Sequence, residues 1–236
     1  MPTTWLYPKI FPCADIGGQI NYRNGSPYAA YCPPGAGTWI GQWGDTPHYN
    51  WYRLLWKWPL GDIPAEQEIT RAVLHIYYGY HYGGGTKPQL IDAYHITTPD
   101  PGDFPQAILD INDWDTGADL IQASWGGFPV WGGNYGYKTL DVTDFLKSDY
   151  DADKDWFPIR LRGFPEDTNL TNWVFVTMYF NAGSGPRPDG TSGALLPLIE
   201  VEFTPPPPGA VFRSRQYLVA AQRPRLDIQY IIVKIT

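Results

Sequence analysis

The chain has little of what would direct it towards a helical, membrane or disulfide-rich fold. Among its 236 residues are only two cysteines, two methionines and four histidines. No run of apolar residues approaches the length that a membrane helix needs. The opening MPTTWLYPKIFPC has neither a basic nor an apolar region typical of a signal peptide, so none is expected here. Cys13 and Cys32 either pair or stay as thiols, and the sequence does not separate these alternatives.

What the chain has in abundance favours strands and turns. It contains 11 tryptophans, 17 tyrosines, 25 glycines and 24 prolines, and helical periodicity is nearly absent. Residues 51–60 and 69–82 alternate with period two, and apolar Leu54, Trp56, Trp58, Ala72, Leu74 and Ile76 are expected to form a core face. Residues Arg53, Leu55 and Lys57 are expected to face away from that core. One short helix is predicted after Thr143, which suits an N-cap.

Further strands are predicted at residues 4–7, 89–97, 156–162, 173–180 and 195–204. Residues 98–138 read as a long loop, 8–50 as mostly extended loops and 181–194 as a flexible loop. The four prolines 205–208 separate a sandwich domain, 1–204, from a C-terminal arm, 205–236. The arm carries +4 and the rest −11, which makes nucleic acid an improbable partner of the domain.

Several short motifs resemble the DNRLRE-type jelly-roll family, which occurs in secreted carbohydrate-binding modules and in phage-encoded proteins. One block runs from Arg53 through Trp58 and Pro64 to Ile76, and a second, DVT, stands at 141–143. Phe157–Gly163, Pro197–Phe203 and again Pro224–Tyr230 match its later strands. The resemblance implies an all-β jelly-roll β-sandwich over roughly residues 50–204. Some members bind acidic polysaccharides such as alginate.

Candidate binding residues fall into two groups. Aromatic rings in glycine-rich sequence suit stacking on a sugar or a partner protein, although a self-packed loop explains them equally well. They are Trp114, Trp125, Trp131, Tyr135 and Tyr137. Arg53 and Lys57 on one strand, with Arg160 and Arg162 on another, suit an acidic polysaccharide, or else cross-strand pairing with carboxylates.

Two acidic segments have oxygen ligands at spacings that calcium uses, although a solvated turn is the commoner explanation. They comprise Asp149, Asp151, Asp153 and Asp155, and Asp110, Asn112, Asp113 and Asp115. Lys154 stands where an EF-hand requires glycine, so that motif is excluded. The three histidines His75, His81 and His95 are expected on neighbouring strands and are weak candidates for zinc.

No nucleophile elbow, phosphate-binding glycine loop or zinc-protease helix occurs in the sequence, so an enzyme is the least favoured class. The expected function is a non-enzymatic structural protein of a phage virion, such as a capsid decoration (cement) protein or a fibre or tail component. Its partners would be protein subunits of a homo-oligomer or capsid, and its location the virion. The alternative is an extracellular carbohydrate-binding module for an acidic polysaccharide.

Overall fold

The chain folds as an all-β protein in a computed structural model. The structure describes residues 1–7, 17–23, 26–31, 37–45, 48–65, 67–83, 89–98, 117–128, 136–164, 174–179 and 182–204. The predicted C-terminal arm, residues 205–236, and both cysteines lie outside these ranges. Within them, no helix is long and apolar enough to cross a membrane.

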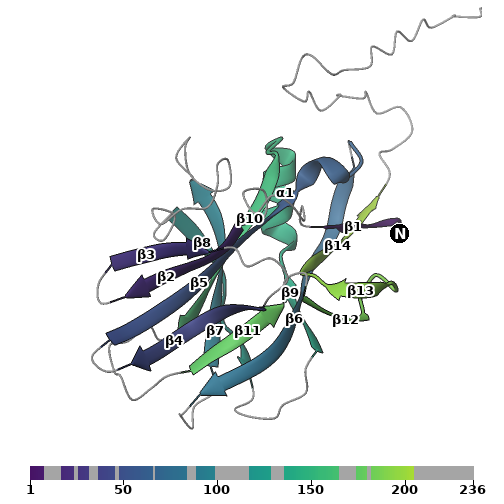
Figure 1. Cartoon of the computed structure of the whole chain (residues 1–236). Coiled ribbons are helices and arrows are strands. Elements are labelled where there is room, and N and C mark those ends of the chain that lie inside the picture. The colour runs from purple at the N-terminus through teal and green to yellow at the C-terminus, as the bar shows by residue number, and fades with distance from the viewer. Residues whose placement is uncertain are drawn as a thin grey trace, which may run out of the picture.

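Twelve strands form one continuous antiparallel sheet that folds over itself (Figure 1). Its main path runs β1-β14-β6-β11-β4-β5-β10-β7-β8, with β2 and β3 added beside β5 and β9 added beside β6. The bounds are β1 Thr3–Leu6, β2 Gly17–Arg23, β3 Ser26–Tyr31, β4 Gly37–Asp45, β5 His48–Pro59, β6 Glu68–Gly83, β7 Gln89–Thr98, β8 Gly117–Phe128, β9 Gly136–Asp141, β10 Trp156–Phe164, β11 Val174–Tyr179 and β14 Leu198–Thr204. A separate hairpin joins β12 (Ala182–Pro186) to β13 (Ser192–Leu195).

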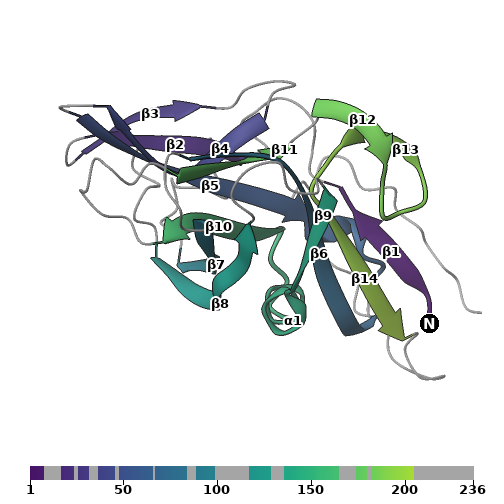
Figure 2. The same cartoon turned by 90° about the horizontal axis from the view of Figure 1, so that it is seen from below.

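Strands β5 and β6 hold the sandwich together because each pairs with different neighbours along its length. Strand β5 pairs with β4 through residues 48–52 and with β10 through residues 53–59. Strand β6 pairs with β14 through residues 68–75 and with β11 through residues 78–83. Seen from below, β2, β3, β4 and β5 lie in one layer and β7, β8 and β10 in another (Figure 2). This is a β-sandwich of jelly-roll character, as the strand pattern predicts.

The core lies between these layers and contains the residues predicted from alternation. Leu54, Trp56, Trp58, Ala72, Leu74 and Ile76 are all at most 1% exposed. On the opposite face of β5, Arg53, Leu55 and Lys57 lie outside that core cluster as predicted, yet they are only 7%, 0% and 3% exposed. Strand β5 is therefore a central strand buried on both faces, and its long basic side chains extend over its outer surface.

The one α-helix, α1 (Thr143–Asp151), confirms the predicted helix and extends it. Its cap differs from the prediction, because the carboxylate of Asp141 accepts hydrogen bonds from the backbone N–H and the hydroxyl of Thr143, at 2.9 and 2.6 Å. The Thr143 hydroxyl oxygen in turn accepts from the backbone N–H of Ala72 at 2.9 Å, and the Ala72 carbonyl lies 3.3 Å from the same oxygen. The DVT motif thus joins the helix start to β6.

Sequence reasoning missed strands in three places. Residues 8–50 contain β2, β3 and β4, residues 98–138 contain β8 and the first half of β9, and residues 181–194 contain nearly all of the β12–β13 hairpin. Strand β8 (GADLIQASWGGF) lies at the sheet edge, and most of its residues from Gly117 to Ser124 are exposed or half-buried. An edge strand with two exposed faces has no need of apolar alternation, so its sequence resembles a loop.

Candidate functional site

The four cations predicted on two strands form one ladder on the outer face of the sheet. Strands β5 and β10 are adjacent, and their register places Arg162 opposite Arg53 and Arg160 opposite Leu55. Lys57 lies opposite Pro158 on the same face. The β7 register then sets Asp92 opposite Arg162. Alternation explains the shared face, since paired residues of neighbouring strands point to the same side.

Aromatic rings lie against this cationic ladder. The ammonium of Lys57 lies 4.4 Å from the Trp156 ring centroid. The guanidinium carbons of Arg160 and Arg162 lie 5.1 and 4.9 Å from that of Tyr94. Cations at such distances are attracted by the ring quadrupole, more strongly where water is excluded. Arg160, like Arg53 and Lys57, is less than a tenth exposed, so these charges act within the protein.

Asp92 is the acidic partner of the ladder. Its Oδ2 accepts from Arg162 Nη2 at 2.9 Å and from the Tyr94 hydroxyl at 3.2 Å. Its Oδ1 accepts from the backbone N–H of Ser124 at 3.0 Å, where the φ of 51° is unusual for a residue with a side chain. Arg162 also donates to the Tyr94 hydroxyl. Burial raises the pKa of Tyr94, while the charge of Arg162 opposes that rise. The network fixes these groups in place.

The aromatic residues predicted to bind a glycan or partner do not form a common exposed surface in the described structure. Trp125 is 4% exposed and donates from Nε1 to the carbonyl of Thr139 at 2.8 Å, so its assignment as a presented ring is wrong. Tyr137 is half-buried and packs edge-on against Tyr77 at 5.2 Å. Burial raises the pKa of Tyr137, and the nearby backbone of Leu196 opposes this rise. Trp114, Trp131 and Tyr135 lie outside the described residues.

The first acidic segment is the end of a helix and the turn after it. Asp149 is buried, with Oδ2 2.6 Å from His95 Nε2 and Oδ1 2.7 Å from Lys154 Nζ. Asp151 pairs with Lys147 at 3.5 Å on the helix surface. In the part of the chain that the structure describes, no group of three or more acidic, histidine or cysteine side chains is arranged to hold a metal ion.

Calcium binding at this segment therefore stays a prediction, and the structure gives it no ligand set. Asp153, after the helix, has a φ of 56°, and the carbonyl of Asp155 accepts from Leu60 N at 3.0 Å. The second acidic segment, with Asp110, Asn112, Asp113 and Asp115, lies outside the described residues.

The predicted histidine group is not assembled in the described structure. His95 is buried on the core side beside Asp149. His75 lies 3.4 Å from Glu200 on the outer side of β6 and stacks obliquely on Trp5 at 5.4 Å. Zinc binding by the two together has no support here, and the side chain of His81 lies outside the described part.

A surface depression of about 480 Å³, which no sequence pattern predicts, lies beside the start of α1. It is lined by residues of β6, β8, β9 and α1, namely Thr70, Arg71, Ile121, Asp141, Val142, Thr143, Asp144 and Phe145. Its lining combines one guanidinium and two carboxylates with three apolar residues. Such a lining suits a small polar molecule or a side chain of a partner.

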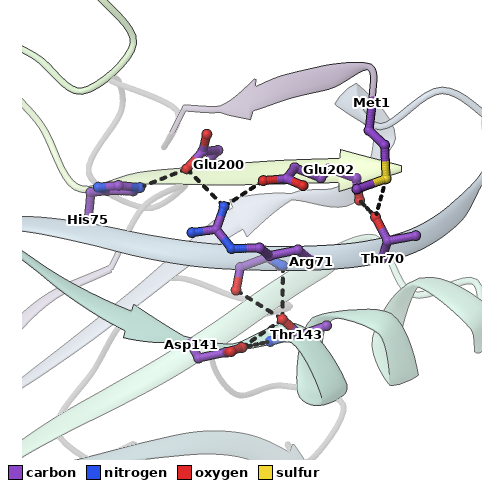
Figure 3. Close-up of polar contacts among 9 residues, drawn as sticks. Met1, Thr70, Arg71, His75, Asp141, Thr143, Glu200 and Glu202 are labelled. Atoms are coloured by element: carbon purple, nitrogen blue, oxygen red, sulfur yellow. Dashed lines mark hydrogen bonds and ion pairs between the residues drawn. The ribbon is translucent and has the colours of Figure 1, made fainter. Parts of the chain in front are cut away.

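Arg71 ties this depression to an ion-pair network on β14 (Figure 3). Its Nη1 lies 2.6 Å from Glu202 Oε1 and 3.5 Å from Glu200 Oε2. The hydrogen bond with Glu202 raises the pKa of Arg71. Burial lowers the pKa of His75, although Glu200 acts in the opposite direction. Two hydrogen bonds from Thr143 lower the pKa of Asp141. The network is exposed and therefore weak in stabilising the fold.

Comparisons with known proteins identify no relative. Neither the scan against family models nor the search of curated proteins found a match. The resemblance to the DNRLRE-type family therefore stays a prediction that rests on its motifs and on the sandwich fold.

Proposed function

We propose that the protein is a non-enzymatic structural component of a phage virion, such as a capsid decoration protein or a fibre or tail component. The observation that carries the proposal is the position of the last described strand, β14, next to the edge of the sheet. This strand pairs with β6 on one side and with β1, the terminal strand of the sheet path, on the other. Strand β14 therefore ends at Thr204 as the second strand from this edge of the sheet (Figure 1), and residues 205–236 follow it in the sequence.

The sequence of that segment supports an assembly role. Four prolines are followed by the apolar LDIQYIIVKI, which needs a surface to cover it. Pairing with a strand of a neighbouring subunit is one established way to do so. The segment carries +4 and the remainder −11, so attraction to the acidic body of a neighbour would assist docking.

The use of charge in the described structure also favours a structural protein. The cations of the ladder on β5 and β10 contact aromatic rings and Asp92, and these contacts stabilise the sheet. A catalytic site would instead need charged groups that a substrate can reach. The motif resemblance adds the phage context, since that family is common among phage-encoded proteins.

Truncation after Thr204 tests the proposal. We expect the shortened chain to keep its circular dichroism spectrum and a cooperative melt, and to lose self-association or binding to capsids. Double substitution Ile228→Asp with Ile232→Asp in the full chain should have the same effect. Gln229→Asp is the control, because residues 225–235 are expected to form a strand in which Gln229 lies on the face opposite Ile228 and Ile232. Unfolding of the truncated chain would make the segment part of the core and defeat the proposal.

A carbohydrate-binding module for an acidic polysaccharide is the second candidate, and the exposure of Arg162 within the cationic ladder favours it. The side chain of Arg162 is 29% exposed, whereas Arg53, Lys57 and Arg160 are buried. Alginate binding that weakens with added salt and with Arg162→Gln would support this function. A panel of acidic and neutral glycans with no binding would eliminate it.

A further inference from the structure

A buried polar cluster joins helix α1 to the sheet, apart from the cationic ladder. His95 of β7 and Asp149 in the last turn of α1 are 4% and 1% exposed at their side chains, and His95 Nε2 lies 2.6 Å from Asp149 Oδ2. Lys154, just after the helix, is 39% exposed, and its Nζ lies 2.7 Å from Asp149 Oδ1. One exposed ammonium is thus in contact with a buried carboxylate.

Aromatic rings enclose the imidazole of His95. The ring stacks on Phe157 of β10 at 5.4 Å with an interplanar angle of 17°, and Phe145 of α1 packs against it at 5.3 Å. Its Nδ1 is buried, and no hydrogen-bond partner for it occurs among the described residues. Only the Nε2 side of the ring is therefore engaged in polar contact.

This geometry determines the protonation state of His95. An ionised Asp149 only accepts hydrogen bonds, so Nε2 must carry the proton that lies between them. A second proton on Nδ1 would be a buried donor without an acceptor, which is costly. Asp119, the cross-strand partner of His95 on β8, is exposed, and β10 presents the uncharged Phe157 and Ile159. These contacts favour an uncharged imidazole with its proton on Nε2, and Lys154 then supplies the positive charge beside Asp149.

The turn after α1 holds Lys154 in this position. Its backbone N–H donates to the carbonyl of Asp149 at 3.1 Å, and Asp153 before it takes a left-handed φ of 56°. The Lys154 ammonium meets Oδ1 outside hydrogen-bond geometry, although the distance is short. It acts mainly as a counter-charge, and a buried charge that loses its partner is strongly unfavourable.

We propose that His95, Asp149 and Lys154 together hold the C-terminal end of α1 against the sheet, and we call this group the latch. Lys154 is its accessible member, and loss of the Lys154 charge opens the latch. Removing the Lys154 charge leaves Asp149 buried beside a neutral imidazole, which favours release of the helix end into water. The N-terminal end of α1 stays attached because Thr143 bonds Ala72 of β6.

Lys147 provides a matched control for Lys154. Its side chain is also 39% exposed, and it pairs with Asp151, which is 56% exposed, at 3.5 Å. We expect Lys154→Met in the full chain to speed amide hydrogen exchange at Ala152 and Lys154 by about tenfold to a hundredfold, as a local opening would. Lys147→Met should leave these rates within about twofold, and exchange in β10 should not change. Equal rates in the two variants would overturn the latch.

The unsubstituted protein supplies an independent test should Lys154→Met fail to fold. Nitrogen-15 NMR of the His95 ring near neutral pH should show a protonated Nε2 and an unprotonated Nδ1. Two protonated ring nitrogens, or a proton on Nδ1 alone, would contradict the assigned charge balance and with it the role of Lys154. Neither measurement depends on the virion proposal.

Discussion

Replacing Trp58 should damage the core more than any neighbouring substitution of similar size. Its side chain is fully buried, and its ring packs edge-on against Trp56 at 6.5 Å and obliquely against Phe157 at 6.4 Å. Its indole Nε1 also donates to the carbonyl of Pro197 at 3.1 Å, across 139 residues of sequence. Trp58→Ala therefore removes packing and leaves a buried carbonyl without its partner.

The expected cost follows from these two losses. Truncating a buried aromatic residue costs about 3–5 kcal/mol, and an abandoned buried partner adds about 1–3 kcal/mol. A sum of at least about 4 kcal/mol should lower the melting temperature by roughly 8 °C or more in a chain of this size. Trp58→Phe keeps most of the packing and loses the hydrogen bond, so its cost should be clearly smaller.

Urea denaturation followed by far-ultraviolet circular dichroism measures these differences without relying on tryptophan emission. Trp5→Ala is the control, because Trp5 is half-buried on the terminal strand β1. If Trp58→Ala unfolds within about 1 kcal/mol of the parent, far below the usual cost of such a cavity, the assignment of this face to the core is refuted.

Three further outcomes follow from the described contacts. Asp141→Ala should lower the free energy of unfolding in urea by about 1 kcal/mol, because the hydrogen bonds that Thr143 donates to Asp141 begin the helix. In the parent protein these bonds should lose their contribution as the pH falls below about 4, because the folded state lowers the pKa of Asp141. Burial lowers the pKa of His75 in the folded protein, so the unfolded chain binds a proton more readily, and stability should decline as the pH falls through about 6.5. His75→Gln should flatten that part of the curve of urea midpoint against pH. An unchanged slope would contradict this. Calcium added to chelator-treated protein should raise the melting temperature if either acidic segment binds it, and no shift at millimolar calcium would dismiss both.

Much of the fold could be predicted from alternation because the central strands carry it clearly. The core faces of β5 and β6 were correctly identified, from Leu54 to Trp58 and from Ala72 to Ile76. Alternation fails for β8, whose residues are mostly exposed on both sides, and it misleads for Arg53 and Lys57. Polar residues on the face of a strand opposite the core normally lie in solvent. The face of β5 with Arg53 and Lys57 is covered by groups of neighbouring strands, which the sequence of β5 does not show.

The candidate sites were harder to predict because they depend on contacts between residues distant in sequence. Arg53 and Arg162 become neighbours through the pairing of β5 with β10. Asp149 resembles a calcium ligand by spacing, yet it faces His95, 54 residues away. Arg71 meets Glu202 across 131 residues, and no local pattern indicates that contact. A single sequence contains the residue types of such sites and little about their partners.

Sedimentation velocity of the full chain over a wide concentration range tests the proposed assembly role most directly. The proposal predicts species larger than the 26.7 kDa monomer, which dissociate when Ile228 and Ile232 are both replaced by aspartate and persist in the Gln229→Asp control. A monomer at every concentration, with no binding to capsid particles added to the same cell, would contradict it.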